Sequence, residues 1–494
     1  MEIDARERIG GGGFAPLADP STRNHFRPTM QRIYRSAISF FQGAPWRRYL
    51  GFFLLGFLLR LPVLVLAVAN PARAIPPGDA PGYYQLAVNL VQHGAFSPSS
   101  SAPFQPDPFR TPGYPLFLAL IFFLAGSSTL AVVFAQSLLH AVTGLVIVRL
   151  GEKVFGSLRI GVIGCLLWAI APLPAIFAGL LLTEILFTAV FLTLLLVITE
   201  THLMYSALGG ALLGAAILVR PVGIFLWPSL LPALSLGVGW RRAIAKCILF
   251  SAMVAAVIAP WLYRNYHIFG RVTLEAVQNN LLYYNAAGYI TWRDGITLGE
   301  ARDAATRYYQ QYLAEKGLHP ANAVEESDAM SSAAIRMLLA DPFRAIWFNG
   351  LDSLNGLRPG ASYFIIYLEP GIITPDSTTN GELSPASSNI ARPEVLLVTI
   401  LLSIFYGVLY LLSAIGILQL LWDRKWTALV LLVVPCLLIM YAPALASNAR
   451  FRIPIEPVLC LLAAWALGEV IPAFVSRVLL RTRISPLKKQ PVNS

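Results

Sequence analysis

Long apolar runs recur along most of this chain, and several approach or exceed the roughly 20 residues that an α-helix needs to cross a bilayer. Only 13% of the 494 residues are charged, whereas soluble domains average about 25%. The chain is therefore predicted to be an all-α, multi-pass membrane protein. Ten transmembrane helices are predicted, at about 50–69, 130–150, 160–177, 180–198, 206–219, 222–238, 244–263, 394–421, 426–442 and 453–474.

The basic residues predict which ends of these helices face the cytoplasm. They concentrate in the polar tail 1–49, in the links 151–159, 239–246 and 423–425, and in the tail 476–494. Ten crossings place all five segments on one side, and the positive-inside rule makes that side the cytoplasm. Topology thus explains the net charge of +11, and no nucleic-acid partner is predicted. Both basic tails are expected to be cytoplasmic, and the first to be disordered.

The first outer loop, residues 70–129, contains an apolar stretch at 115–126. Its 12 residues are too few to cross a bilayer. A crossing would also move the basic links that follow to the wrong side of the membrane. We therefore expect this stretch to lie in the membrane interface or to re-enter the membrane from the outer side.

A second outer segment, residues 265–393, is polar and holds half of the chain's acidic residues. Helices are predicted within it over 298–316 and 323–340, where apolar residues recur at helical spacing. The segment separates an N-terminal transmembrane core, 50–264, from the C-terminal transmembrane helices, 394–475.

Charged residues gather at the outer ends of the predicted helices. Any one of them could be an interfacial residue that snorkels or forms a surface ion pair. Their joint placement at one membrane face favours a shared cavity that binds an anionic headgroup and transfers a proton. These residues are Asp79, Arg110, Glu184, Arg220, Arg264 and Arg450.

Asp79 lies on a short turn between Gly78 and Pro81, just before a helix predicted over 80–93. Three roles are open for it. It could cap that helix, or act as a general base that accepts a proton from a hydroxyl or an amine. It could also bind a divalent cation, with Glu184 as a possible partner.

Six motifs then point to one group of proteins. They are GDAPGYYQLA at 78–87, FRTPGYPLFLAL at 109–120, LLTEILF at 181–187, LVRPVG at 218–223, PWLYRNY at 260–266 and RFRIPIEP at 450–457. In these motifs and their order, the chain resembles the GT-C glycosyltransferases, specifically the bacterial branch near the lipid A aminoarabinose transferases and the protein O-mannosyltransferases. The resemblance implies a GT-C-like bundle of about ten transmembrane helices. It further implies interfacial helices in the first outer loop, a periplasmic insertion, and an active site facing the periplasm from the bacterial inner membrane.

The resemblance also implies a chemistry. The donor would be a polyprenyl-phosphate-linked sugar, the acceptor a lipid, a glycan or a protein, and the reaction a direct displacement with inversion. Asp79 matches the first-loop acid assigned as catalytic base, and Glu184 is predicted to be catalytic with it. Ala80 and Pro81 stand where many relatives have a second acid, so no cofactor is certain and a divalent metal remains possible. Substrate contacts are predicted for Tyr83, Arg110, Tyr114, Arg220, Arg264 and Arg450.

An alternative function is a transporter or flippase for a lipid-linked glycan. Arg60, inside the first predicted span, favours this alternative, because a charge at that depth must face water or the protein interior. A transporter should also carry polar residues near the midplane of interrupted helices, whereas here the charges cluster at one face. Neither GxGxxG nor GxxxxGK[ST] occurs in the sequence; an activated donor would supply the energy for transfer.

Overall fold

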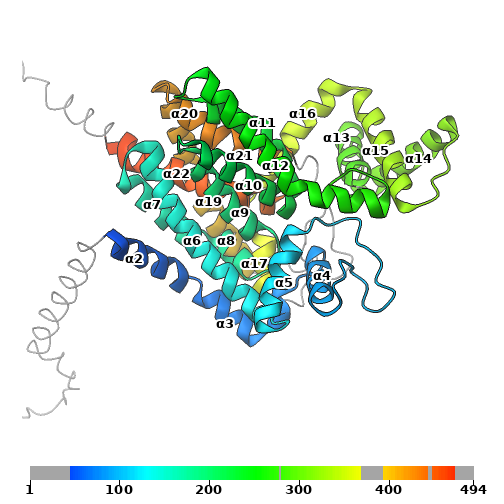
Figure 1. The fold of residues 1–494 in the computed structure, drawn as a ribbon, viewed down its shortest axis with the longest axis horizontal. Coiled ribbons are helices and arrows are strands. Elements are labelled where there is room, and N and C mark those ends of the chain that lie inside the picture. Colours follow the sequence, from blue (N-terminus) through cyan, green and yellow to red (C-terminus); the bar gives the residue numbers. More distant parts are fainter. Residues whose placement is uncertain (1–44, 277–279, 369–392, 443–447, 473–494) are drawn as a thin grey trace, which may run out of the picture. The chain divides into compact units, whose positions relative to one another are not determined.

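A computed structural model describes residues 45–276, 280–368, 393–442 and 448–472, and within these ranges the secondary structure is helical, without strands (Figure 1). Residues Phe53–Ser494 form one compact unit, separate from Met1–Phe52. The predicted tail 476–494, and nearly all of the predicted tail 1–49, lie outside the described residues.

Each of the ten predicted spans corresponds to one helix or to a closely connected group of helices. By length and composition, five are able to cross a membrane, or six if α7 and α8, which bend by 61° at their junction, form one span. The other four are apolar helices of 10–17 residues, so ten crossings remain a prediction. In order, the ten are α2–α3 (Pro45–Leu58, Leu61–Ala69), α6 (Thr129–Phe155), α7–α8 (Leu158–Ile170, Pro172–Ala178), α9 (Glu184–Ile198), α10 (Leu203–Val219), η2–α11 (Pro221–Phe225, Leu226–Ser235), α12 (Trp240–Phe269), α19 (Pro393–Trp422), α20–η6–α21 (Trp426–Ala428, Leu429–Val433, Val434–Tyr441) and η7–α22–η8 (Ala449–Ile455, Glu456–Trp465, Ala466–Val470).

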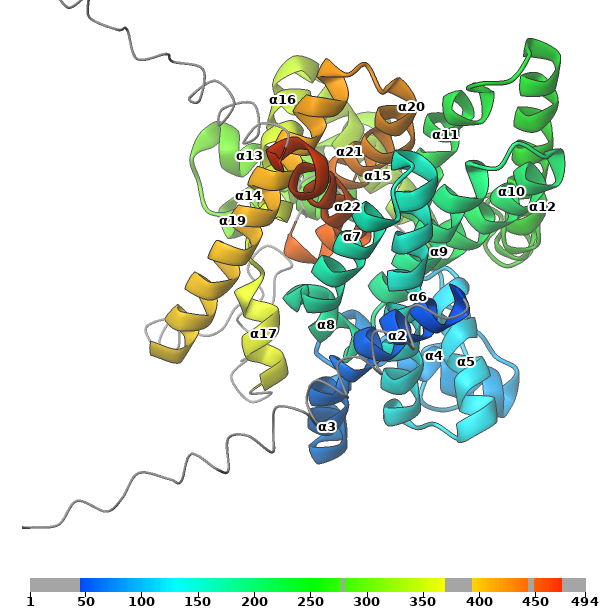
Figure 2. The ribbon, with the colours of Figure 1, turned by 90° about the vertical axis from the view of Figure 1, so that its left-hand side faces the viewer.

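Seven helices of these predicted spans pack side by side in a row, which can be followed in Figure 2. The row runs α19, α22, α7, α6, α9, α10 and α12. Small residues permit the close approaches, as is common between membrane helices. A Cβ at Gly161 or at Gly416 would overlap the backbone of the facing helix, α6 and α22 respectively.

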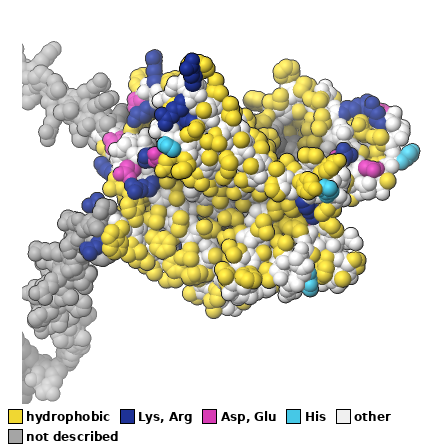
Figure 3. All heavy atoms as spheres, in the orientation of Figure 1, with side chains coloured by type: hydrophobic (Ala, Val, Ile, Leu, Met, Phe, Trp, Pro, Cys, Tyr) yellow, Lys and Arg dark blue, Asp and Glu magenta, His cyan; other side chains and the backbone are white. Residues whose placement is uncertain are grey.

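Contacts between links place two of the basic segments at one end of this bundle. Lys153 pairs with Glu200 across 2.6 Å, and Arg242 donates to the carbonyl of Thr201 at 3.1 Å. The 151–159 and 239–246 links therefore meet on one face, as the predicted topology requires. Figure 3 agrees: hydrophobic side chains cover the middle of the visible surface, and charged ones gather toward its two ends.

The first outer loop contains the helices η1 (Pro71–Ala74), α4 (Asp79–His93) and α5 (Gly113–Ala125). With 13 residues, α5 is about 20 Å long, shorter than the ~30 Å hydrocarbon layer. One side of α5 packs on α4, where Phe122 contacts Tyr84 at 5.3 Å between ring centroids. Its other side exposes Leu116, Leu120 and Phe123. An apolar helix of this length agrees with the predicted interfacial or re-entrant stretch.

Within the second predicted outer segment, the helices between residues 282 and 337 share one hydrophobic core and form a small subdomain. Two of its helices, α14 (Leu298–Lys316) and α15 (Ala323–Leu339), confirm the helices predicted over 298–316 and 323–340. A capping box formed by Thr297 and Glu300 begins α14. The remaining helices of the segment are η3 (Leu281–Ala286), α13 (Ala287–Asp294), α16 (Pro342–Ser353), η4 (Leu354–Leu357) and α17 (Ala361–Leu368).

Candidate active site

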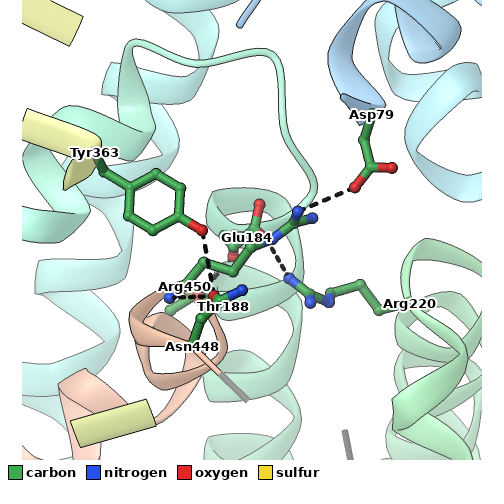
Figure 4. Close-up of polar contacts among 7 residues, drawn as sticks. All are labelled: Asp79, Glu184, Thr188, Arg220, Tyr363, Asn448 and Arg450. Atoms are coloured by element: carbon green, nitrogen blue, oxygen red, sulfur yellow. Dashed lines mark hydrogen bonds and ion pairs between the residues drawn. The ribbon is translucent and has the colours of Figure 1, made fainter. Parts of the chain in front are cut away.

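Four charged residues from four separate elements meet at the end of the bundle opposite the basic links (Figure 4). Arg450 Nη1 donates to Asp79 Oδ2 at 3.0 Å, and Arg450 Nε donates to Glu184 Oε1 at 2.7 Å. Arg220 Nη1 donates to the same Glu184 oxygen at 2.5 Å. The structure therefore brings together an acid of the first outer loop, the start of α9, the end of α10 and η7.

Local backbone geometry explains where Asp79 lies. Gly78 has φ 101°, a conformation that residues with a side chain rarely adopt, and it turns the chain directly into α4. Asp79 is the first residue of that helix, where the helix dipole favours a negative charge. Gly78 holds the capping position, and the Asp79 carboxylate accepts from Arg450 instead. Of the three predicted roles, capping is the one that this geometry does not support.

Glu184 lies beneath the site, not on its surface. Its side chain is fully buried, and Oε1 accepts from both arginines, while Oε2 has no hydrogen-bond partner among the described residues. A buried carboxylate needs opposite charge close by, and Arg220 and Arg450 provide it. Arg220 reaches this position because α10 ends at Val219 and Pro221 begins η2.

A cavity of about 650 Å³ lies over these ion pairs. Its size falls in the range of about 300–1,000 Å³ that is typical of small-molecule sites. Three arginines and two carboxylates contribute to its wall. The lining residues are Asp79, Tyr83, Pro98, Phe109, Arg110, Thr111, Thr183, Val219, Arg220, Pro221, Val222, Glu275, Asn280, Arg450 and Phe451.

Arg110 is held against the cavity by the loop that precedes α5. Its Nη1 forms an ion pair of 2.9 Å with Asp107, which is fully buried and also accepts from the backbone amides of Phe109 and Arg110. The guanidinium lies 5.5 Å from the ring centroid of Tyr83. Gly113 packs so tightly on the end of α10 that a Cβ there would overlap its backbone. The loop therefore places Arg110 at the same cavity as Arg220.

Two residues with predicted substrate contacts lie away from the cavity wall. Tyr114 is fully buried, and its hydroxyl donates to Gln136 Oε1 at 2.9 Å. Arg264 donates to the carbonyl of Asp107 at 3.1 Å, and its guanidinium lies 4.6 Å from the ring of Trp261. These contacts support the loop that carries Arg110. The other predicted residues, Asp79, Tyr83, Arg110, Arg220 and Arg450, all line the cavity.

Sequence reasoning missed several residues of the site. Glu275 and Asn280 line the cavity from the segment after α12, and no motif marked them. Asp107 had a signal: an acid three residues before Arg110 in a proline-rich loop has the spacing of a local ion pair. Thr183, next to Glu184, lines the wall as well.

The charges around Asp79 determine its protonation state. Burial pushes its pKa up, but the charge and hydrogen bond of Arg450, together with the charges of Arg110 and Arg220, outweigh this effect. The pKa of Asp79 is therefore held below its ordinary value of 3.8, and the carboxylate is ionised at neutral pH. Burial and the nearby carboxylates raise the pKa of Tyr83 well above its usual range, so its hydroxyl stays protonated.

The donor set does not fit a divalent cation. Among the described residues, no group of three or more His, Cys, Asp or Glu side chains is placed to bind a metal ion. The ionised carboxylate of Asp79 already has the guanidinium of Arg450 as its cationic partner.

The chain is also similar to proteins of known family and structure. Residues 108–263 match the family model of the dolichyl-phosphate-mannose-protein mannosyltransferases. The match begins just before Arg110 and ends within α12, so it includes Glu184 and Arg220 but neither Asp79 nor Arg450. No curated protein matches the chain as a sequence relative.

Three solved structures are among those that match the chain. The archaeal oligosaccharyltransferase AglB from Archaeoglobus fulgidus is 15% identical with a TM-score of 0.46, over 90% of this chain and 52% of AglB. ArnT from Cupriavidus metallidurans, bound to undecaprenyl phosphate, is 14% identical with a TM-score of 0.40, over 90% and 82%. The arabinosyltransferase EmbB from Mycobacterium smegmatis is 14% identical with a TM-score of 0.31, over 84% and 41%. This chain thus spans about half the length of AglB. The family match confirms the resemblance predicted from the motifs: this chain is similar to the GT-C superfamily of glycosyltransferases.

Proposed function

We propose that this chain is a membrane glycosyltransferase that transfers a sugar from a polyprenyl-phosphate donor to an acceptor at the outer face of the bacterial inner membrane. The observation that carries the proposal is the cavity itself. Two carboxylates, Asp79 and Glu275, and three guanidiniums line a single space of about 650 Å³ at the end of the bundle opposite the basic links, and Asp79 is held ionised.

The arginines suit a phosphate leaving group. Guanidiniums bind phosphate oxygens in a planar, two-pronged geometry and stay charged at all physiological pH values. Arg220 and Arg450 share one oxygen of Glu184, so their positions are fixed before substrate arrives. Charge that develops on the departing phosphate would then be stabilised without reorganisation of the protein.

Asp79 supplies the base for the other half of the reaction. The acceptor hydroxyl or amine gives its proton to the Asp79 carboxylate while its lone pair attacks the anomeric carbon. The bond from that carbon to the phosphate oxygen breaks, and its electron pair stays on the phosphate, next to the arginines. One bond forms as the other breaks on the opposite face, so the configuration at the anomeric carbon inverts.

Glu184 has a positioning role in this proposal. Its carboxylate is buried, does not line the cavity, and has one oxygen occupied by two guanidiniums. A group in this position cannot reach an acceptor in the cavity without breaking both ion pairs. Glu184, predicted to be catalytic, has in this proposal the task of holding Arg220 and Arg450 in place.

Arg60, the residue that favours the transporter alternative, lies inside the protein. Arg60 is 2% exposed, and its Nη2 donates to the carbonyl of Ala169 near the end of α7. The charge thus faces the protein interior, where Nη2 binds a helix end, while Nε and Nη1 have no hydrogen-bond partner among the described residues.

Transfer and transport can be separated with the purified chain in lipid nanodiscs. We expect release of free polyprenyl phosphate when a polyprenyl-phosphate sugar and an acceptor extract are added. Movement of intact donor across liposome membranes, without release of the lipid phosphate, would support the flippase and overturn the proposal. Glycolipid and surface-polysaccharide profiles of a deletion strain would then identify the sugar and the acceptor by what is missing.

The pH dependence should report the Asp79–Arg450 pair. In the free protein the pKa of Asp79 lies below 3.8, so the acid limb of kcat/KM should lie below that pH. A bound donor phosphate would compete for Arg450 and weaken the effect that lowers the pKa, so the acid limb of kcat should move to higher pH. Rates measured against pH at subsaturating and at saturating donor concentrations test whether the acid limb of kcat lies at higher pH than that of kcat/KM. A kcat/KM limb near neutrality would indicate a base other than Asp79.

Gly82→Ala should weaken donor binding without unfolding the protein. A Cβ at position 82 would overlap the guanidinium of Arg110, which Asp107 holds in place. Alanine favours a helix over glycine by about 1 kcal/mol, so α4 itself should not suffer. We expect the donor KM to rise about tenfold or more, since a hydrogen bond to a charged group contributes about 1.5–3 kcal/mol.

Gly299→Ala is the matched control for this variant, because Gly299 lies in the first turn of α14, where the nearest atom to an added Cβ, Thr297 Oγ1, is 3.9 Å away. Its donor KM should equal that of the unmodified chain. An unchanged KM in Gly82→Ala as well would remove Arg110 from donor binding.

A further inference from the structure

α16 carries an exposed apolar face of unusual extent for the predicted outer segment. Phe343 is 85% exposed, Ile346 60% and Trp347 64%. The spacing of three and four residues places these side chains on one side of the helix. Leu351, and Leu354 in η4, are exposed as well. Figure 3 shows hydrophobic side chains on the surface where Figure 1 places α16.

The opposite side of α16 is already occupied. Phe348 is buried and stacks on Trp292, with 5.3 Å between ring centroids, and also contacts Tyr289 at 6.1 Å. The helix is therefore apolar on two sides, only one of which is covered by the protein. Arg344, near the start of the helix, is exposed and pairs with Asp341 at 3.4 Å. The exposed apolar face of the rest of the helix is of the kind that is normally covered by protein or by lipid.

Its contact with α21 indicates the depth of α16. Asn349 Nδ2 donates to the carbonyl of Tyr441, the last residue of α21, at 3.3 Å. This span begins at Trp426, directly after the charged link 423–425, which must lie at the opposite membrane surface. From Trp426 to Tyr441 a helix rises about 23 Å, less than the ~30 Å hydrocarbon layer. Asn349 thus lies at the level of the hydrocarbon.

The contact of η4 with α19 gives a second, independent depth. The hydroxyl of Tyr410 donates to the carbonyl of Leu357 at 2.9 Å. Tyr410 precedes Trp422, the end of α19 at the basic face, by a rise of about 18 Å. η4 therefore lies deeper than α16, and the chain descends into the membrane from α16 to η4.

Buried side chains satisfy the backbone at the deepest point. Arg452, which is fully buried, donates Nη1 to the carbonyls of Gly356 at 3.2 Å and Arg358 at 2.6 Å. Because the Tyr410 hydroxyl binds the carbonyl of Leu357, the three successive carbonyls of residues 356–358 all accept hydrogen bonds from side chains. Non-helical backbone at membrane depth is stable only where protein groups complete its hydrogen bonds.

We infer that α16 and η4 form a re-entrant segment inserted in the membrane leaflet that carries the cavity, with its apolar face against lipid acyl chains. The predicted periplasmic segment 265–393 then contains a membrane-embedded part. The long stem of Arg358, an exposed side chain, lets its charge reach toward the headgroups. Since η4 is bonded through Arg452 to η7, lipid contact anchors the element that carries Arg450.

Spin labels can measure what covers this face. Phe343→Cys and Trp347→Cys are labelled with a nitroxide in the full-length chain in nanodiscs, in a Cys247→Ser background, because the other cysteines are buried. Collision rates are compared for oxygen, which concentrates in the bilayer, and a water-soluble nickel chelate. Leu437→Cys, on the exposed side of α21, is the lipid control, and Lys316→Cys, exposed on α14, is the water control.

We expect the oxygen-to-nickel ratio at 343 and 347 to match that at 437 and to exceed that at 316 several-fold. A ratio equal to that at 316 would place the face in water and overturn the inference. Low collision rates with both reagents would show a protein cover, such as a second copy of the chain, and would overturn it as well. If Trp347→Cys does not fold, Ile346→Cys repeats the measurement. The readout requires no sugar transfer, so it stands apart from the proposed enzymatic function.

Discussion

Asp79→Asn is expected to lower kcat for sugar transfer by about 10²–10⁴-fold, the usual contribution of a general base. The amide has nearly the same shape and can still accept a hydrogen bond from Arg450, but it cannot take a proton from the acceptor. Half of the side chain is exposed to the cavity, so the change should not unfold the protein. Measurement of kcat and of protein abundance in membranes tests both statements.

The donor KM distinguishes this role from a structural one. Loss of the negative charge at position 79 frees Arg450 for phosphate, so donor affinity should stay the same or increase. Asp294→Asn is the control, because Asp294 is a surface carboxylate at the end of α13 that pairs only with its exposed neighbour Arg293. Asp79→Asn with the kcat of the unmodified chain would remove Asp79 from the mechanism.

Much of the fold can be predicted because a bilayer imposes a length. Apolar runs near 20 residues have few alternatives to transmembrane helices, and the charges of the short links then determine which ends lie together. Asp79, Glu184, Arg220 and Arg450 meet for the same reason: each lies at a helix end, and all of these ends lie at one membrane face. The topology therefore predicts that these four residues lie at the same level relative to the membrane.

Their orientation around the helix axis could not be predicted in this way. Neighbouring residues on a helix point about 100° apart, so only tertiary packing determines whether a side chain reaches the cavity. Arg264 and Tyr114 have the right height but pack behind the loop that carries Arg110. Glu275 and Asn280 reach the wall from a segment without a motif. The depth of α16 is likewise hidden, because its sequence is compatible with an ordinary surface helix.

The roles of the two acids also depend on packing. In the sequence, Asp79 and Glu184 are equivalent carboxylates near arginines. In the structure one is half-exposed to the cavity, whereas the other is fully buried beneath it. Only a carboxylate that can contact substrate can serve as its base. Burial thus separates a catalytic task from a positioning task.

Glu184→Gln is expected to destabilise the protein by about 3–5 kcal/mol, the usual cost of removing one partner of a buried ion pair. The neutral amide would leave Arg220 and Arg450 with two adjacent positive charges and no carboxylate between them. Thermal unfolding in nanodiscs should show a large drop in Tm. Glu152→Gln, which breaks an exposed pair with Arg149, should change stability by at most about 1 kcal/mol.

A second substitution tests the cause of that loss. Arg220→Gln, added to Glu184→Gln, removes a cation that has lost its carboxylate partner, so the double variant should regain part of the stability that the single variant loses. If Glu184 were instead the catalytic base, Glu184→Gln would keep normal stability and lose sugar transfer. That pattern would make Glu184 a catalytic residue and overturn its positioning role. Partial recovery of Tm, with the donor KM still raised because Arg220 is absent, would instead show that Glu184 acts through the arginines it holds.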